Sequence, residues 1–155
     1  MTPRLLEVNT RDLGAAVPGL SSYSPPARAG VKTAGSKRIL VIDDEPTVRQ
    51  VLRDVLASEG FLVTEAADGY QGLDCLRVGR PDMVILDLMM PVMNGWKFVE
   101  ECRRIDRCGD VPIIAISAMF DVPGASPALH GLGVHACLSK PFDIDVLLSL
   151  VARLT

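Results

Sequence analysis

Five side chains that could carry phosphoryl or metal chemistry stand at the ends of four short apolar segments. They are Asp43, Asp44, Asp87, Ser117 and Lys140. An apolar run that stops at a polar residue is typical of a buried parallel strand, and the carboxyl ends of parallel strands meet at one edge of a sheet. We therefore expect these five side chains to lie together.

Three carboxylates at one edge would repel one another, and partial burial would raise their pKa values, unless a cation lies among them. Mg²⁺ meets that need, because it takes one or two carboxylates, keeps several waters and also binds phosphate oxygens. Lys140 would add an ammonium charge and Ser117 a hydroxyl donor. Together these groups suit phosphoryl transfer to a carboxylate, with Asp87 as the nucleophile.

Each of these residues also has a structural interpretation when it is taken alone. Asp44 could cap the helix that follows it, and Asp87 could be a turn residue. A single serine or lysine indicates even less. The functional interpretation is favoured because a suitable group occurs at four strand ends in succession.

Apolar runs and amphipathic segments alternate from Lys37 onward. The predicted strands cover residues 39–42, 61–64, 83–86, 113–116 and 136–138. The predicted helices cover residues 48–56, 68–79, 96–105, 127–132 and 146–154. This alternation predicts an α/β fold in which a doubly wound, five-stranded parallel sheet carries helices on both faces.

Local signals set several of the helix ends. Gly60 stands where a glycine commonly ends a helix, and Asp143 is placed to cap the last helix. Proline is favoured at the first helical position but costs about 3 kcal/mol inside a helix. The fourth helix is therefore predicted to be short, to start at Pro127 and to follow a long loop that contains Pro123.

The first 36 residues differ from the rest of the chain. They contain four prolines, several serines and glycines, and no sustained hydrophobic periodicity. We predict a mostly disordered tail over residues 1–36 and a folded domain over residues 37–155. Within the tail, residues 4–8 could form a brief helical turn.

The composition excludes several classes of protein. A chain of 155 residues with 48% hydrophobic and 23% charged residues can bury one well-formed core. The net charge of −3 argues against binding to nucleic acid or to anionic membranes. No apolar run could cross a bilayer, and the N-terminus has no signal-peptide pattern. The four cysteines form no CxxC pair, which favours reduced thiols and a cytoplasmic protein.

Four segments of the chain resemble the response-regulator receiver domain of two-component signalling. They are residues 39–46 (ILVIDDEP), residues 87–95 (DLMMPVMNG), Ser117-Ala118 and Lys140-Pro141-Phe142. Their spacing is similar to that of the family over the whole of residues 37–155. The resemblance implies a flavodoxin-like receiver fold with the strand order 2-1-3-4-5.

The resemblance also implies a role for each acidic residue. Asp87 would accept a phosphoryl group from a phosphohistidine on a sensor histidine kinase or a histidine phosphotransfer protein. Asp43 and Asp44 would hold Mg²⁺, with Asp87 and the backbone carbonyl of Met89 as the other protein ligands.

Ser117 and Lys140 would bind the phosphoryl oxygens, and the Lys140–Pro141 peptide bond would be cis, as is usual in the family. Phosphorylation would then shift the surface formed by the fourth helix, the fifth strand and the fifth helix, and this surface would bind a downstream protein.

Three features depart from the family pattern. Cys137 stands where the family commonly has a tyrosine or phenylalanine that reports the movement of the serine, so we expect this thiol to serve packing. The prolines in residues 121–127 make the fourth helix atypical. Residues 134–155 carry few charges, which leaves little material for a charge-paired homodimer.

Two further positions concern the lifetime of the phosphorylated form. Met89 and Met119 stand two residues after Asp87 and Ser117, where the family tunes hydrolysis of the aspartyl phosphate. Neither thioether can orient an attacking water, so we expect a comparatively long-lived phosphorylated form.

The sequence therefore predicts a stand-alone signalling switch with Mg²⁺ as its cofactor, which catalyses only its own phosphorylation and dephosphorylation. Two alternatives remain open at this point. A haloacid-dehalogenase phosphatase also uses an aspartate and magnesium, but it expects a second aspartate where this chain has Met89. A receiver-like protein-binding module that works without phosphorylation is the stronger alternative.

Overall fold

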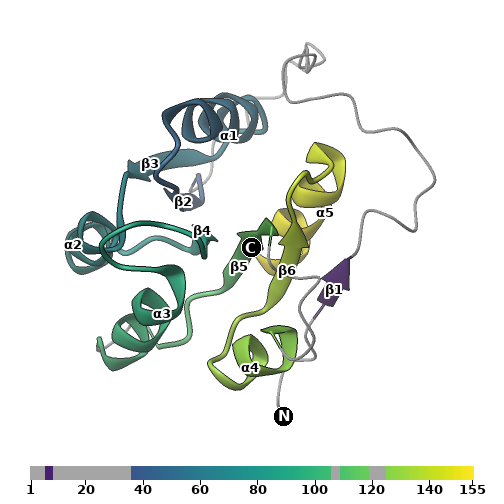
Figure 1. Cartoon of the computed structure of the whole chain (residues 1–155). Coiled ribbons are helices and arrows are strands. Elements are labelled where there is room, and N and C mark those ends of the chain that lie inside the picture. Colours follow the sequence, from purple (N-terminus) through teal and green to yellow (C-terminus); the bar gives the residue numbers. More distant parts are fainter. Residues whose placement is uncertain (1–5, 9–35, 106–108, 119–124) are drawn as a thin grey trace.

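The computed structural model describes residues 6–8, 36–105, 109–118 and 125–155. The five predicted strands are present as β2 (Arg38–Ile42), β3 (Leu62–Ala66), β4 (Met83–Asp87), β5 (Ile113–Ser117) and β6 (Ala136–Ser139). They pair in parallel in the order β3-β2-β4-β5-β6, which is the predicted order 2-1-3-4-5 of the five strands. Figure 1 shows this sheet with its helices.

The five predicted helices are α1 (Pro46–Ser58), α2 (Gly69–Gly79), α3 (Gly95–Arg104), α4 (Ala125–Gly131) and α5 (Ile144–Leu154). Asp143 caps α5 as predicted, since its side chain accepts hydrogen bonds from the next turn. Gly60 follows α1 with φ +91°, the conformation expected of a glycine that ends a helix. Helix α4 begins two residues before Pro127, which still leaves the proline in the first turn.

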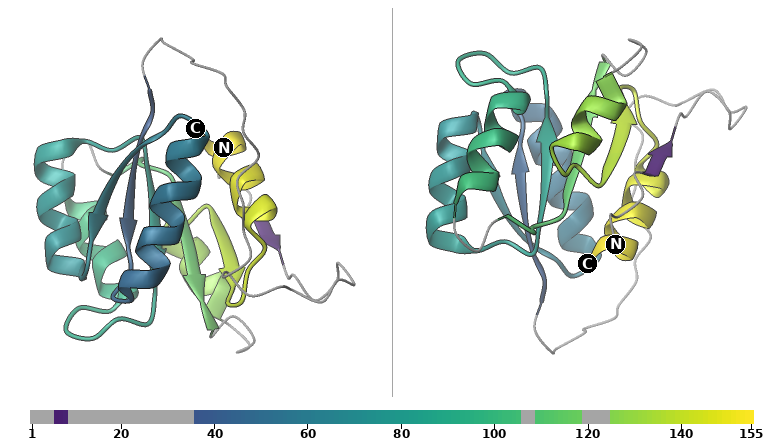
Figure 2. Two further views of the ribbon diagram at one scale, coloured as in Figure 1. Left: turned by 90° about the horizontal axis from the view of Figure 1, so that it is seen from above. Right: turned by 90° about the horizontal axis from the view of Figure 1, so that it is seen from below.

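The helices cover both faces of the sheet, as the alternating pattern predicts (Figure 2). One buried cluster joins one face of the sheet to α2, α3 and α4, and a second joins the opposite face to α1 and α5. Strands β4 and β5 are buried along their whole length. A sheet buried on both faces is a rigid base, so the carboxyl ends of its strands can hold side chains at fixed positions.

The sheet has a sixth strand that the sequence analysis does not predict. Residues Leu6–Val8 form β1, which pairs in parallel with β6 at the edge of the sheet (Figure 1). The prediction of a helical turn over residues 4–8 is therefore wrong. Leu6, Glu7 and Val8 alternate with the period of a strand, and an isolated turn of helix gains too few hydrogen bonds to persist. The remainder of the predicted tail lies outside the described residues.

The glycine within α2 is explained by close packing. A Cβ atom at Gly72 would stand 2.6 Å from Cδ1 of Ile42 and 2.9 Å from Cε2 of Phe98. Phe98 is fully buried on α3. Gly72 thus lowers helix propensity but lets α2 approach the sheet and α3 closely.

Arg103, near the C-terminal end of α3, joins this helix to two other segments of the chain. Its guanidinium donates to the carbonyl oxygens of Gly109 (2.6 Å), Val111 (3.1 Å), Leu132 (3.3 Å) and Gly133 (2.7 Å). These carbonyls belong to the connections before β5 and after α4. The planar fork of arginine suits such a multiple contact, which a lysine could not reproduce.

Replacing Arg103 with methionine should lower the free energy of unfolding by about 2–4 kcal/mol, because the stem is kept while several partly buried carbonyls lose a charged donor. Urea denaturation measures this effect. Arg104→Met is the matched control, since Arg104 pairs with Glu101 at the surface, and it should change stability by less than about 1 kcal/mol. Equal losses in the two variants would contradict the proposed importance of these carbonyl contacts.

Candidate active site

The acidic cluster lies at the carboxyl ends of two neighbouring strands. Asp43 directly follows β2 and Asp87 is the last residue of β4, and these strands pair in register from Ile39 to Ile42. One carboxylate oxygen from each of Asp43, Asp44 and Asp87 lies within 4.8 Å of the other two. Asp43 and Asp87 are buried, whereas Asp44 is exposed. The cluster thus combines two buried carboxylates with one that faces solvent.

Lys140 joins this cluster from the other half of the sheet. Its Nζ atom donates to Oδ2 of Asp87 at 2.8 Å and to Oδ2 of Asp43 at 3.0 Å. The peptide bond between Lys140 and Pro141 is cis, as the family resemblance implies. Three carboxylates and one ammonium group leave a formal charge of −2 at the site.

Backbone groups hold the second oxygen of each buried carboxylate. Oδ1 of Asp43 accepts from the amide of Glu45 at 2.8 Å, and Oδ1 of Asp87 accepts from the amide of Met89 at 2.9 Å. The alternative role of Asp44 as a helix cap is wrong, because Glu45 is the N-cap residue of α1 and makes no side-chain capping bond.

Burial and neighbouring charges shift the pKa values of Asp43 and Lys140 in the cluster. Desolvation raises the pKa of Asp43 above its ordinary value, although the amide of Glu45 and the ammonium of Lys140 oppose that shift. Desolvation lowers the pKa of Lys140, but the hydrogen bonds and charges of Asp87 and Asp43 outweigh it, so the net pKa is raised. The ammonium group is therefore charged at neutral pH.

The remaining predicted residues have different surroundings. Ser117 is fully buried at the end of β5, and its carbonyl accepts from the amide of Lys140 at 3.0 Å. The side chain of Met89 is 54% exposed beside Asp87. Cys137 is buried in the core cluster with α2, α3 and α4, as expected for a packing residue. Met119 lies outside the described residues.

The loop after Asp87 contains two constraints that sequence reasoning missed. A Cβ atom at Gly95 would stand 2.6 Å from the Cα of Leu88 and 2.7 Å from the carbonyl oxygen of Asp87. Val92 has φ +70°, a strained conformation for a β-branched residue. The segment DLMMPVMNG thus folds tightly back toward Asp87, and the glycine in it was the available signal.

Comparison with known proteins identifies the family. The family model of the response regulator receiver domain matches residues 39–152 of this chain. The chain belongs to the response regulator receiver family. It is a receiver domain of the kind found in two-component response regulators, which are signalling switches based on phosphorylation.

Two similar proteins match this chain over different fractions of their own length. The DNA-binding response regulator MtrA of Mycolicibacterium smegmatis is 40% identical over 119 residues, which are 76% of this chain and 50% of that protein. The chain thus spans about half the length of the curated relatives that it matches. The chemotaxis protein CheY4 of Vibrio cholerae has a TM-score of 0.74 and 30% identity over 78% of this chain and 100% of that chain.

A third comparison concerns the cofactor. The response regulator TrrA of Thermotoga maritima, solved in complex with Mg²⁺–BeF, has a TM-score of 0.68 and 33% identity over 77% of this chain and 99% of that chain. In the present receiver domain, three carboxylates with oxygens within 4.8 Å of one another fit a hard divalent cation. The raised pKa of Asp43 is the shift that such a cation would relieve.

Replacing Asp43 with asparagine should stabilise the metal-free receiver domain by about 1 kcal/mol, or roughly 2–4 °C in Tm, because a desolvated charge is removed. Magnesium should then no longer raise the Tm. Thermal unfolding with and without Mg²⁺ measures both effects, and Asp54→Asn, at an exposed ion pair, should leave them unchanged.

The pH dependence of the metal-free protein follows from the same shift. Because the pKa of Asp43 is raised on folding, its protonation favours the folded state, and this contribution is lost as the pH rises through the raised pKa. The wild type should therefore gain stability relative to Asp43→Asn as the pH falls from neutral. A constant difference between the two proteins across that range would contradict the assigned cause.

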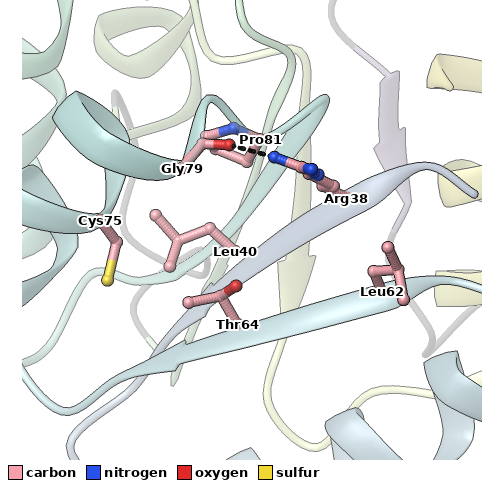
Figure 3. Close-up of a pocket in the computed structure, with 7 residues that line it drawn as sticks. All are labelled: Arg38, Leu40, Leu62, Thr64, Cys75, Gly79 and Pro81. Carbon is pink, nitrogen blue, oxygen red and sulfur yellow. Dashed lines mark hydrogen bonds between the residues drawn. The ribbon is translucent and has the colours of Figure 1, made fainter.

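A separate pocket lies at the opposite end of the sheet (Figure 3). It has a volume of about 250 Å³ between the amino-terminal parts of β2 and β3 and the end of α2, and Arg38, Leu62 and Cys75 are among its lining residues. Burial raises the pKa of the Cys75 thiol, which disfavours the reactive thiolate.

Among the described residues, no helix is long and apolar enough to cross a membrane.

Proposed function

We propose that the receiver domain over residues 37–155 is a switch in which Asp87 accepts a phosphoryl group in a magnesium-dependent reaction. The observation that carries this proposal is the contact of Lys140 Nζ with both Asp43 and Asp87, at a place where three carboxylates converge. This set offers a nucleophile, a binding place for a cation and a fixed positive charge within one site.

The reaction forms one bond and breaks one bond. A carboxylate oxygen of Asp87 attacks the phosphorus, and the bond from phosphorus to the imidazole nitrogen of a phosphohistidine breaks, so that the electron pair leaves with the imidazole. Lys140, held beside Asp87, offsets the charge of the phosphoryl oxygens. The hydroxyl of Ser117, at the end of the neighbouring β5, would donate to one of those oxygens.

Asp43, Asp44 and Asp87 would hold the magnesium ion, together with the backbone carbonyl of Met89. When bound, Mg²⁺ supplies positive charge that lowers the repulsion between the carboxylates and the incoming phosphoryl group. The buried clusters on the two faces of the sheet hold the strands that end at Asp43 and Asp87 in fixed positions.

Phosphorylation would change the surface formed by α4, β6 and α5. The new charge of about −1.5 to −2 would attract Ser117, and β6 is the strand that pairs with β5 and leads into Lys140. We propose a sensor histidine kinase or a phosphotransfer protein as the donor and a protein as the target of this surface. Direct contact of residues 37–155 with nucleic acid is not part of the proposal, although the similar MtrA is a DNA-binding regulator.

Incubation with acetyl phosphate tests the proposal. The switch predicts one hydroxylamine-labile phosphoryl group per chain, which forms in Mg²⁺ and fails to form in EDTA. Continuous release of inorganic phosphate from many phosphate esters would indicate a phosphatase instead. An unmodified chain that still binds its partner would indicate a phosphorylation-independent module.

The phosphorylated form should be long-lived, because Met89 and Met119 cannot orient a water. Met119→Glu should shorten the half-life of the phosphoryl group by about tenfold, less than the roughly 10²–10⁴-fold that a well-positioned acid or base contributes. Denaturing quench at timed intervals measures the half-life. Val78→Glu, at an exposed residue of α2, is the control. A wild-type half-life no longer than that of Met119→Glu would contradict the predicted long lifetime of the phosphorylated form.

A further inference from the structure

The edge of β6 is covered by a strand from the start of the chain. In β1, Leu6 pairs with Ala136, Glu7 with Cys137 and Val8 with Leu138. Figures 1 and 2 show β1 beside β6. In the five-stranded order of the predicted fold this edge would be open, and an open strand edge is a template for pairing with another chain.

The direction of the backbone groups shows what β1 satisfies. The amide of Lys140 donates to the carbonyl of Ser117 in β5, and consecutive residues of a strand direct their backbone groups to opposite sides. Since Ser117 pairs with Ser139, Ala136 and Leu138 direct their backbone groups toward β5, and Cys137 directs its N–H and carbonyl toward β1. Cys137 is buried, although it belongs to what would be an edge strand.

The sequence of β1 suits this edge. Leu6-Glu7-Val8 alternates apolar and polar residues, and the register places the two apolar positions opposite Ala136 and Leu138. These two β6 residues belong to the buried cluster with α1 and α5. An extended segment with an apolar–X–apolar pattern is thus the ligand that the edge would select.

The length of the connection permits pairing within one chain. Four strand spacings separate β1 from β2, and the chain must also return along the sheet, a span of roughly 25 Å. Residues 9–35 connect the two strands, and even half of that length could cover the span when extended. A second copy of the chain is not needed.

We propose that the β6 edge is a strand-accepting surface, which residues 6–8 of the same chain occupy and thereby close to other extended segments. The proposal does not depend on phosphorylation. It places the resident strand beside the α4–β6–α5 surface, so that a partner adding a strand there would have to displace β1 first.

Hydrogen exchange of single amides in the full chain tests the pairing. In a parallel pair, one residue of each opposed couple directs both backbone groups to the other strand, and opposite Glu7 that residue is Cys137. Val8 therefore supplies an N–H toward β6, which proline would remove. In Val8→Pro the amide of Cys137 should exchange at least tenfold faster. The amides of Ala136 and Leu138 should match the wild type, and so should all amides in the control Glu7→Pro, which loses only an N–H directed away from β6.

A labelled peptide of residues 1–12 tests the surface as a binding site. It should bind full-length Val8→Pro at least tenfold more tightly than wild type, because the tethered strand competes at an effective concentration in the millimolar range. The magnesium-dependent rise in Tm should be the same in both proteins and shows that the variant is folded.

Three results would overturn the proposal. They are equal peptide affinity for the two proteins, an unprotected Cys137 amide in the wild type, and a wild-type dimer in sedimentation that Val8→Pro dissociates. The last result would assign the strand to a second copy of the chain.

Discussion

Asp87→Asn should incorporate no phosphate from acetyl phosphate under conditions in which the wild type is fully modified. The amide keeps the size of the side chain, but it has no carboxylate oxygen that could form the acyl phosphate. The loss should be complete rather than partial, because Asp87 is the proposed acceptor of the phosphoryl group. Phosphate-affinity electrophoresis after a timed reaction measures the modified fraction.

The control for this variant is a carboxylate away from the cluster. Asp74→Asn changes an exposed residue of α2 that pairs with Arg77, and it should keep full incorporation. Binding of Mg²⁺ to Asp87→Asn should weaken as well, because one of the three carboxylates is lost. Modification of Asp87→Asn to the wild-type extent would show that the nucleophile lies elsewhere.

Lys140→Ala should have the second large effect. Its ammonium group contacts both buried carboxylates, so its loss should slow phosphorylation by acetyl phosphate by about 10²–10³-fold, the range found when one electrostatic donor is removed from an active site. The metal-free protein should also lose about 2–3 kcal/mol of stability, because Asp43 and Asp87 keep their buried charges without a partner. Magnesium should restore part of this loss.

Lys97→Ala is the matched control for the lysine. Lys97 also contacts two carboxylates, those of Glu100 and Glu101, but Lys97 and Glu100 are exposed to solvent and Glu101 is partly exposed. Exposed ion pairs contribute about 0–1 kcal/mol, so this variant should unfold and react nearly as the wild type does. Similar effects of the two substitutions would argue against a special role of the buried contact.

The strand ends and the acidic cluster could be predicted from the sequence for a physical reason. Buried parallel strands must be apolar along their whole length, so an aspartate directly after Ile42 or Leu86 marks the point where the chain leaves the core. Parallel pairing then brings such points to one edge. No distance information is therefore needed to expect Asp43, Asp87 and Lys140 at one place.

Features that depend on long-range geometry could not be predicted in this way. The strand at Leu6–Val8 requires an open edge far along the chain, and three residues are too short for a periodic signal. The four carbonyl contacts of Arg103 depend on two loops that the sequence does not place. Gly72 lowers the helix propensity of α2, and the close packing that explains it depends on how near Phe98 and Ile42 lie.

Reductive trapping of the phosphorylated protein tests the central claim most directly. Borohydride reduces an aspartyl phosphate to homoserine, and tandem mass spectrometry of the digested chain locates that residue. After reaction with a phosphodonor in Mg²⁺, we predict homoserine at position 87 alone, and none after reaction in EDTA. Homoserine at another aspartate, or an unreduced position 87 in a chain that has gained phosphate, would contradict the account.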